Sequence, residues 1–216
     1  MQEKILNVTN GDCFNKYFIT QFGGVALPFC EAIMDGEVVQ EIYSKEFIKL
    51  RSNALNVSEN EYRNKMHVHN ALSKNAYSTI CLWFGKDTFC QMNLLTILAY
   101  LEQKKYQGKL ILNYIDDQTF AVIEKDIDVK LGIYNNIYKE ILLSKSMPKD
   151  LGVLNATAVN LFFDYRSNGG FLSTLIKNNA NMDKRELICL LLKESKSYGL
   201  SDLQAERLIA STLSSR

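Results

Sequence analysis

The 216-residue chain has two prolines, one tryptophan and almost no net charge. It contains 25 Lys and Arg residues against 24 Asp and Glu residues, which gives a formal net charge of +1. A chain this close to neutral has no overall field to attract nucleic acid or an anionic membrane. It has no run of about 18 apolar residues to span a bilayer, and its start, MQEKILNVTNGD, lacks the apolar stretch of a signal peptide. We therefore expect no membrane partner and a cytoplasmic location.

Paired cysteines and the common catalytic motifs are also missing. No Cys-x-x-Cys pair, dinucleotide-binding GxGxxG, phosphate-binding GxxxxGK[ST] or hydrolase GxSxG occurs. His67 and His69 lie two residues apart in a predicted helix and point in different directions, so they do not indicate a metal site. The sequence thus identifies no reaction and no cofactor, and it leaves open whether the chain is an enzyme. The cysteines lie mostly in apolar segments, as is typical of reduced thiols in a cytosolic protein: Cys13, Cys30, Cys81, Cys90 and Cys189.

Apolar residues make up 47% of the chain, which is enough for a sizeable core. Short β-prone runs alternate with helical periodicity over residues 1–147. Such alternation predicts right-handed crossovers, so we predict an α/β domain with a Rossmann-like, mainly parallel sheet and flanking helices. Strands are predicted at 5–9, 25–27, 79–84 and 109–114, and helices at 46–55, at 59–73, from Asp12 to the pair Gly23-Gly24, and from Gly85-Lys86-Asp87-Thr88 to about Glu102.

Capping residues support several of these helices. Asp12 is placed to cap the first helix. Ser58 with Glu61, and Ser201 with Gln204, each have the spacing of a capping box, in which the two residues satisfy each other's backbone N–H groups.

Pro148 lies in the polar stretch Ser144–Asp150, which we interpret as a domain boundary. Residues 148–216 are then a small all-helical C-terminal region. This region ends in a helix-turn-helix-like pattern, with a helix over Asp183–Lys196, a turn at Ser197–Leu200 and a second helix from Ser201. We expect limited proteolysis to cut first near Ser144–Asp150.

Polar residues follow the predicted strands, at the edge of the sheet where open parallel sheets bind ligands. Gathered carboxylates can hold Mg²⁺, act as a general base or accept hydrogen bonds from ribose hydroxyls. Capping is the more common role of any single Asp here, and core packing is the more common role of the strand-end Trp83. Asp35, Asp116 and Asp117 also follow strands, and Arg51 is either a partner for acidic or phosphate groups or an ordinary solvated charge. The predicted ligand-binding residues are Asn10, Gly11, Asp12, Glu31, Trp83, Asp87 and Gln91.

These residues predict a small-molecule or nucleotide-binding protein with an acidic site. Asp12 and Asp87 are expected to share a ligand or cation, and Gln91 to orient it as a donor; no dedicated metal site is assigned.

The alternative is a transcription regulator that binds DNA or a protein partner through the C-terminal helices. Acidic residues interleave with the basic ones there, which disfavours DNA. Those helices can equally pack on the sheet or form a surface for a homo-oligomer. The basic residues are Lys184, Arg185, Lys193, Lys196 and Arg207.

Several of these segments resemble a bacterial family of unknown function, the domain-of-unknown-function family numbered eighteen thirty-five. The resemblance implies a bacterial protein, and family members are often filed as AraC-type transcriptional regulators; it implies no reaction. The chain departs from the family pattern at Pro28-Phe29-Cys30-Glu31, where members more often have a Trp-Arg-Glu/Asp run, and at Gly85-Lys86, where they often have Glu-His. The resembling segments, which together cover most of the chain, are Asn10-Gly11-Asp12, Val25…Glu31-Ala32…Asp35-Gly36-Glu37-Val38, Leu82-Trp83-Phe84-x-x-Asp87-x-Phe89-x-Gln91 and Tyr198-Gly199-Leu200-Ser201-x-x-Gln204-x-Glu206.

Overall fold

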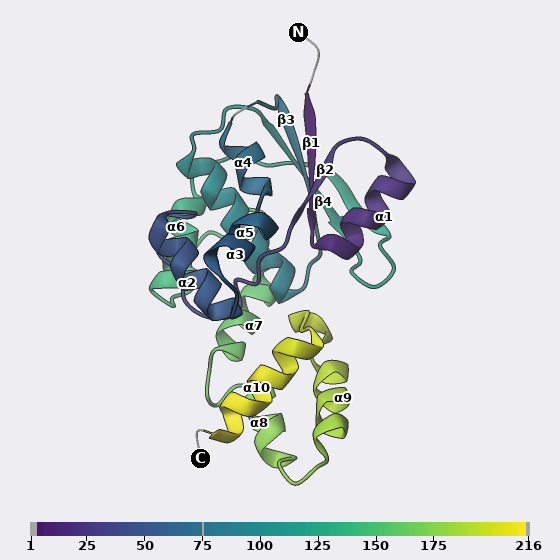
Figure 1. The fold of residues 1–216 in the computed structure, drawn as a ribbon, viewed down its shortest axis with the longest axis vertical. Helices are drawn as coiled ribbons and strands as arrows, with labels where there is room; N and C mark the ends of the chain where they lie inside the picture. The colour runs from purple at the N-terminus through teal and green to yellow at the C-terminus, as the bar shows by residue number, and fades with distance from the viewer. Residues whose placement is uncertain (1–3, 75, 215–216) are drawn as a thin grey trace.

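The structure, a computed structural model, describes residues 4–74 and 76–214. Its centre is a five-stranded sheet in the order β2-β1-β3-β4-β5 (Figure 1). β1 pairs in parallel with both β2 and β3, and β3 pairs in parallel with β4, while β5 is antiparallel to β4. The predicted α/β fold with a mainly parallel sheet is therefore confirmed. The strands are β1 (Ile5–Asn10), β2 (Ala26–Phe29), β3 (Thr79–Phe84), β4 (Lys109–Ile115) and β5 (Val122–Asp128).

Helices cover both faces of the sheet, with α1 on one side and α2 to α6 on the other (Figure 1). The predicted helix at 59–73 is two helices, because the chain leaves the helical path at Met66 and His67. Their bounds are α1 (Asp12–Phe22), α2 (Lys45–Leu55), α3 (Glu59–Lys65), α4 (Val68–Ser73), α5 (Thr88–Gln103) and α6 (Tyr134–Tyr138), which continues into the π-helical turn η1 (Lys139–Leu143).

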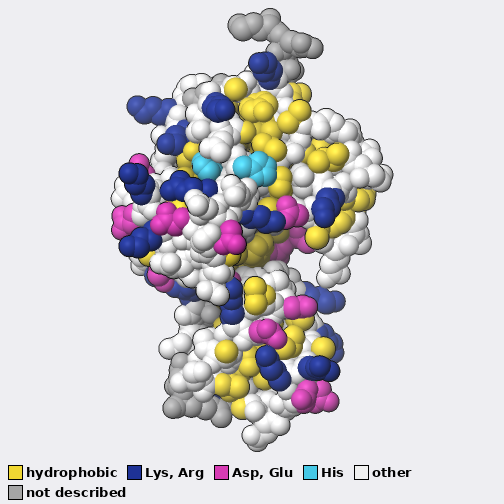
Figure 2. All heavy atoms as spheres, viewed as in Figure 1, with side chains coloured by type: hydrophobic (Ala, Val, Ile, Leu, Met, Phe, Trp, Pro, Cys, Tyr) yellow, Lys and Arg dark blue, Asp and Glu magenta, His cyan; other side chains and the backbone are white. Residues whose placement is uncertain are grey.

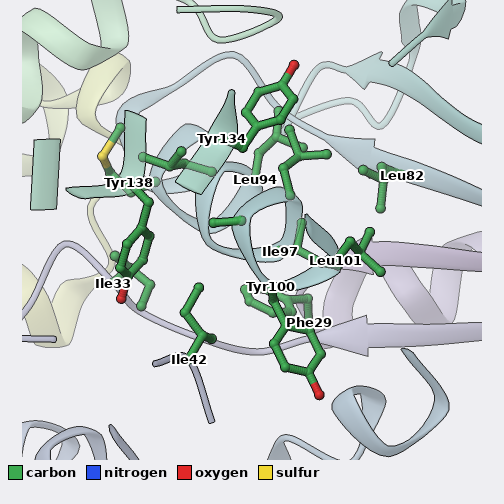
Figure 3. Close-up of a cluster of buried hydrophobic side chains, with 14 of the residues drawn as sticks. Phe29, Ile33, Ile42, Leu82, Leu94, Ile97, Tyr100, Leu101, Tyr134 and Tyr138 are labelled. Carbon is green, nitrogen blue, oxygen red and sulfur yellow. The ribbon is translucent and has the colours of Figure 1, made fainter. Parts of the chain in front are cut away.

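The main hydrophobic core surrounds α5. Every residue of this helix from Cys90 to Leu101 is buried, as is expected of a helix that is apolar on most of its circumference. Figure 3 shows its side chains among those of β2, β3 and α6. This burial fixes the start of α5 at the carboxyl edge of the sheet, where the candidate site lies.

The α1 face has a smaller aromatic core, and Trp83 belongs to it. The Trp83 and Phe18 ring centroids are 5.1 Å apart, and the Trp83 indole N–H donates to Asn7 Oδ1 at 3.0 Å. Trp83 therefore packs beneath α1. The cluster consists of Phe14, Phe18, Ala26 and Ile115, with Tyr17, Trp83 and Phe120 packed against it.

The C-terminal region is helical and lies at one end of the molecule, next to the carboxyl ends of the parallel strands (Figure 1). Val159 and Phe162 of its first helix belong to the main core, whereas α8 to α10 share a separate cluster that includes Leu172, Leu191 and Ile209. The apolar packing thus joins α7 to the α/β part. The bounds are α7 (Ala156–Tyr165), α8 (Phe171–Asn178), α9 (Lys184–Glu194), the 3₁₀ turn η2 (Lys196–Tyr198) and α10 (Asp202–Ser214).

The capping predictions were correct except at Asp12. Ser58 and Glu61 form a capping box, and Ser201 Oγ accepts from the Gln204 N–H while Gln204 Oε1 accepts from the Ser201 N–H. The cap of α1 is instead Gly11, with no side-chain cap hydrogen bond. Asp12 is the first residue of the helix and not its N-cap, and its carboxylate is bound to Lys65 and Cys30 instead. No helix in residues 4–74 and 76–214 is long and apolar enough to cross a membrane.

Candidate functional site

Asp87, Cys90 and Asp117 come together at the carboxyl edge of the sheet. Asp87 lies three residues beyond the end of β3, and Asp117 lies two residues beyond the end of β4. Because β3 and β4 are parallel neighbours, these two ends meet. One potential ligand atom from each of the three residues lies within 4.8 Å of the other two.

Local backbone geometry positions each member of the cluster. Asp87 is the N-cap of α5, and its Oδ1 accepts from the Cys90 N–H at 2.8 Å. The Cys90 thiol in turn donates to Asp117 Oδ1 at 3.3 Å. Gly85 leaves room for the Asp117 carboxylate, which a β-carbon at that position would overlap.

The Asp117 carboxyl group has a strongly raised pKa. Burial of the Asp117 carboxyl group, and then its hydrogen bond and charge repulsion with Asp87, raise the pKa of Asp117 to about 8. Asp117 is exposed as a residue, but its carboxylate is turned onto Gly85 and the buried Cys90 thiol. Burial, followed by the neighbouring charges of Asp87 and Asp117, raises the pKa of Cys90 well above its usual value. The raised pKa values of Cys90 and Asp117 therefore favour the protonated forms of both groups.

A chain of amides holds the Cys90 thiol from its other side. Asn10 Nδ2 donates to Cys90 Sγ at 2.8 Å. Asn93 Nδ2 donates to Asn10 Oδ1 at 3.0 Å and to the Glu31 carbonyl at 2.7 Å. The strand order reverses between β1 and β3, because the chain passes from β1 out to β2 and returns on the other side of β1. The Asn10–Cys90 contact crosses this topological switch point, the place where open α/β sheets bind ligands.

Two cavities adjoin the carboxylate pair. One has a volume of about 320 Å³ and the other about 460 Å³. Both lie between the sheet edge and the C-terminal helices, and both are lined by Asp87, Asp116, Asp117 and Lys196. Lys196 thus places a cation across from the carboxylates. Volumes of this size suit a small ligand.

The predicted site residues divide into those near the cluster and those elsewhere. Asn10 and Asp87 are in contact with it, as described. Gln91 is buried and braces the site: its Nε2 donates to the Gly85 carbonyl at 2.7 Å, and its Oε1 accepts from the Asn155 N–H at 2.8 Å. These two bonds tie the loop after β3 to the start of α7.

The Asp12 carboxylate is engaged elsewhere. It forms an ion pair with Lys65, whose hydrogen bond lowers the pKa of Asp12, and it accepts from the Cys30 thiol at 3.3 Å. Gly11 donates its N–H to the Phe29 carbonyl at 3.0 Å. Asp12 is not part of the group of mutually close ligand atoms among the described residues.

Glu31 and Arg51 form a buried ion pair. The distance from Arg51 Nη2 to Glu31 Oε1 is 2.9 Å, and both side chains are fully buried. The Tyr62 hydroxyl donates to the other Glu31 oxygen, and Arg51 also donates to the carbonyls of Ala32 and Asp35. This network fixes the loop after β2, so Glu31 does not line either cavity beside Asp87.

The predicted ligand-binding residues did not include Cys90, Asn93 or Asp117, although Asp117 was among the carboxylates expected at this edge of the sheet. Asp117 could have been assigned from the sequence because it follows a strand. Cys90 and Asn93 lie inside a helix whose residues are mostly apolar, so no sequence pattern marks them as site residues. Their role depends on contacts with Asn10, which is 80 residues before Cys90.

The cluster has the donor types of a divalent metal site. Zn²⁺ accepts thiolate and carboxylate ligands, whereas Mg²⁺ prefers oxygen ligands. Binding of a metal by Asp87, Cys90 and Asp117 would release the proton that the raised pKa of Asp117 favours and, for a sulfur ligand, the thiol proton. Metal affinity at this cluster would therefore rise with pH.

No family model, curated protein or solved structure matches the chain. The resemblance to the bacterial family thus stays a prediction. What defines the class of the protein is its fold, an α/β sheet of mostly parallel strands with C-terminal helices at its carboxyl edge.

Proposed function

We propose that the chain binds a small molecule or nucleotide at the carboxyl edge of its sheet, in the space between the Asp87–Asp117 pair and the C-terminal helices. The observation that carries the proposal is the position of the Asp87 and Asp117 carboxylates, whose oxygens lie within 4.8 Å of each other beside two cavities. A carboxyl group with a strongly raised pKa, next to a cavity at a switch point, is a common mark of a binding site.

The protonation state of the pair favours a ligand with hydroxyl or amino groups. The raised pKa of Asp117 favours its protonated form, which can donate a hydrogen bond, and the carboxylate oxygens of the pair accept hydrogen bonds. A ribose, which offers adjacent hydroxyl groups, meets both requirements, and Lys196 on the cavity wall complements an anionic group of the same ligand. A divalent cation is the second ligand class, and its binding would release the proton of Asp117.

Thermal unfolding of the full chain tests the proposal. Mg²⁺, Mn²⁺, Zn²⁺, AMP, ATP and ribose are screened against the parent protein, Asp87→Asn and Asp117→Asn. Asn preserves the N-cap at position 87 and removes its charge. The matched control is Asp183→Asn at the N-cap of α9, which lines neither cavity. We expect at least one ligand to raise the Tm of the parent and the control but not that of Asp87→Asn.

Two results would contradict the proposal. One is that none of these probes stabilises the parent. The other is that a stabilising probe acts equally on the parent and on all three variants, which would place its binding away from the carboxylates.

DNA binding through the C-terminal helices stays a prediction, and no observation favours it. Lys184 is paired with Glu206 at 3.3 Å, and Arg207 Nη1 lies 4.0 Å from Asp35 of the α/β part. Figure 2 shows positive and negative side chains interspersed over the face in view. Binding of duplex DNA over a salt series would test the regulator directly.

A further inference from the structure

Lysine side chains gather at the amino edge of the sheet, at the end of the molecule opposite to the C-terminal helices (Figure 1). The parallel strands β1, β3 and β4 begin at this edge, and α4 and α5 end there. The lysines that belong to it are all exposed. We call them the lysine edge: Lys4, Lys74, Lys104, Lys105, Lys109 and Lys130.

Hydrogen bonds between neighbouring strands place part of the lysine edge in a row. The Lys4 N–H donates to Ser78 Oγ at 3.1 Å, and the Lys109 N–H donates to the Ser78 carbonyl at 2.9 Å. Only β3 separates the strands that begin at these two lysines, and neighbouring strands lie about 4.8 Å apart. A cavity of about 390 Å³ follows, lined by both Lys109 and Lys130. The row therefore crosses the edge of the sheet from β1 to the end of β5.

Positive charge predominates along this row and beside it. Three carboxylates accompany the lysines: Asp128 lines the cavity with Lys109, Glu41 lines a cavity with Lys104, and Glu102 lies in the last turn of α5. Glu102 accepts from three backbone N–H groups of the segment after β5. None of the ion pairs within residues 4–74 and 76–214 involves the lysine edge. Six lysines against three carboxylates leave an excess of three positive charges, in a chain whose net charge is only +1.

Lys105 holds its place at a cost in conformational energy. Its φ angle is +53°, directly after the C-cap of α5 at Lys104, where glycine is the residue most often found. The negative end of the helix dipole attracts a cation, but Lys104 already supplies one. Backbone strain of this kind is concentrated at functional sites. The strain at Lys105 is thus an indication of function that is independent of the charge count.

We propose that the lysine edge binds the phosphate backbone of a nucleic-acid duplex without regard to its sequence. A lysine is a flexible point charge that suits a phosphate group. Contacts to phosphates position a protein on a duplex but carry no sequence information. This surface lies at the opposite edge of the sheet from the Asp87–Asp117 pair and does not depend on the function proposed for that pair.

Other polyanionic partners fit this edge less well. Protein interfaces are depleted in lysine and enriched in arginine and aromatic residues. Single strands stack on exposed aromatic rings, whereas Tyr106 is buried and Tyr77 is half-buried. Attachment to a membrane needs apolar side chains that insert among the basic ones. The most exposed large apolar residue, Phe22, instead packs on the ring of Trp83, with centroids 6.1 Å apart.

Fluorescence anisotropy with the full chain tests the proposal. The labelled probes are a DNA duplex, an RNA duplex of the same sequence, a DNA duplex of scrambled sequence and a DNA single strand, from about 25 to 200 mM KCl. We expect the duplexes to bind, with a Kd of about 10⁻⁶–10⁻⁴ M at physiological salt, and the two DNA sequences to bind equally. The logarithm of the binding constant should fall by about 0.9 per phosphate contact for each tenfold rise in salt, and so by about 5 for six lysines. A preference between DNA and RNA would identify which duplex is the partner.

Lys109→Gln combined with Lys130→Gln removes two cations from the row. The variant should bind every duplex more weakly than the parent does, and its salt dependence should be shallower by about 2. The matched control is Arg185→Gln combined with Lys193→Gln, which removes the same charge from exposed positions on α9. The control should bind as the parent does.

Two single variants separate charge from structure. Asp128→Asn removes a carboxylate from the edge and should tighten duplex binding. Lys105→Gly removes both a cation and a left-handed side chain, so it should raise the Tm of the free protein while it weakens duplex binding. A lysine with a purely structural role would not give this combination.

The proposal is overturned if no duplex binds at about 25 mM KCl, if the single strand binds more tightly than the duplexes, or if the variant at Lys109 and Lys130 binds as tightly as the α9 control. Tighter binding to vesicles that contain phosphatidylserine than to the duplexes, at the same salt, would assign the edge to a membrane and would also overturn it. Asp87→Asn should leave duplex binding unchanged, so a failure of the carboxyl-edge site does not affect the result.

Discussion

Gly199 lies directly against the carboxylate of Asp87, so the turn between η2 and α10 rests on the N-cap of α5. The φ angle of Gly199 is +71°, a left-handed conformation that glycine adopts without strain. Beside this contact, Thr88 Oγ1 donates to the Ser197 carbonyl at 3.2 Å. The C-terminal region therefore contacts Asp87, a member of the carboxylate pair, and its neighbour Thr88.

Gly199→Ala should destabilise the chain by about 1–3 kcal/mol, because the new β-carbon has a strained φ and also overlaps Asp87. The control is Gly199→Ala in the Asp87→Ala background, compared with Asp87→Ala alone: it keeps the strained φ and removes the carboxylate that the new β-carbon overlaps. Urea unfolding in both backgrounds separates the strain from the overlap. Equal losses in the two backgrounds would mean that the contact with Asp87 contributes nothing.

Asp117→Asn should flatten the pH dependence of stability between about pH 4 and pH 8. With a pKa of about 8, the Asp117 carboxyl group of the folded chain keeps a proton that the unfolded chain has already lost. The contribution of Asp117 to the stability of the fold is therefore fully present below its unfolded pKa and is lost as pH rises through 8. The variant should therefore be more stable than the parent at pH 9, by about 1 kcal/mol or less because solvent screens an exposed residue. Thermal unfolding at pH 5, 7 and 9 measures this difference. A constant difference across that range would contradict the raised pKa of Asp117.

Elements whose sequence pattern is local could be predicted correctly from the sequence. The continuous apolar run of residues 79–84 predicted β3 with its observed bounds, and Asp87 was correctly expected to precede α5 as its cap. β5 was missed because its residues are mostly exposed and charged, so the strand has no apolar face to reveal it. It forms because β4 supplies a hydrogen-bonding partner.

The candidate site was only partly predictable, because its contacts join residues far apart in the chain. Asp87 and Asp117 meet through the pairing of β3 with β4, a register that no local pattern specifies. Arg51 resembles an ordinary surface charge of a helix in the sequence. It is buried only because the loop after β2 folds over it and Glu31 compensates its charge.

Arg51→Met should cost about 3–5 kcal/mol, because it leaves the Glu31 carboxylate buried without its cation. Replacing both partners, as in Arg51→Met with Glu31→Met, should recover part of that loss. The control is Arg63→Met, which removes an exposed i,i+4 pair with Glu59 and should change stability by less than about 0.5 kcal/mol. Urea unfolding measures all three. A double variant less stable than Arg51→Met would show that the pair itself, rather than the uncompensated charge, carries the stability.

Alkylation by iodoacetamide at pH 8 should modify Cys13 and Cys189 first, because both are exposed. Burial and the neighbouring Asp12 raise the pKa of Cys30 to about 12, so its thiolate fraction at pH 8 is on the order of 10⁻⁴. Cys90 is buried and its pKa is also raised. Peptide mass spectrometry over time measures the order of modification. Labelling of Cys90 as fast as Cys13 would mean that the carboxylate cluster is open to solvent. Labelling in urea is the control for complete modification.

Limited trypsin digestion should cut first after Lys149. The segment from Ser144 to Asp150 is exposed except at Pro148, and the other lysine in it, Lys145, is held by Glu37 and the Leu142 carbonyl. Lys149→Gln should therefore slow the first cut. The two fragments should still migrate together in gel filtration, since α7 contributes Val159 and Phe162 to the main core, and should separate only in denaturant. A first cut inside residues 79–101 would place the weakest segment in the sheet core, and fragments that separate without denaturant would show that α7 does not hold the C-terminal helices to the α/β part.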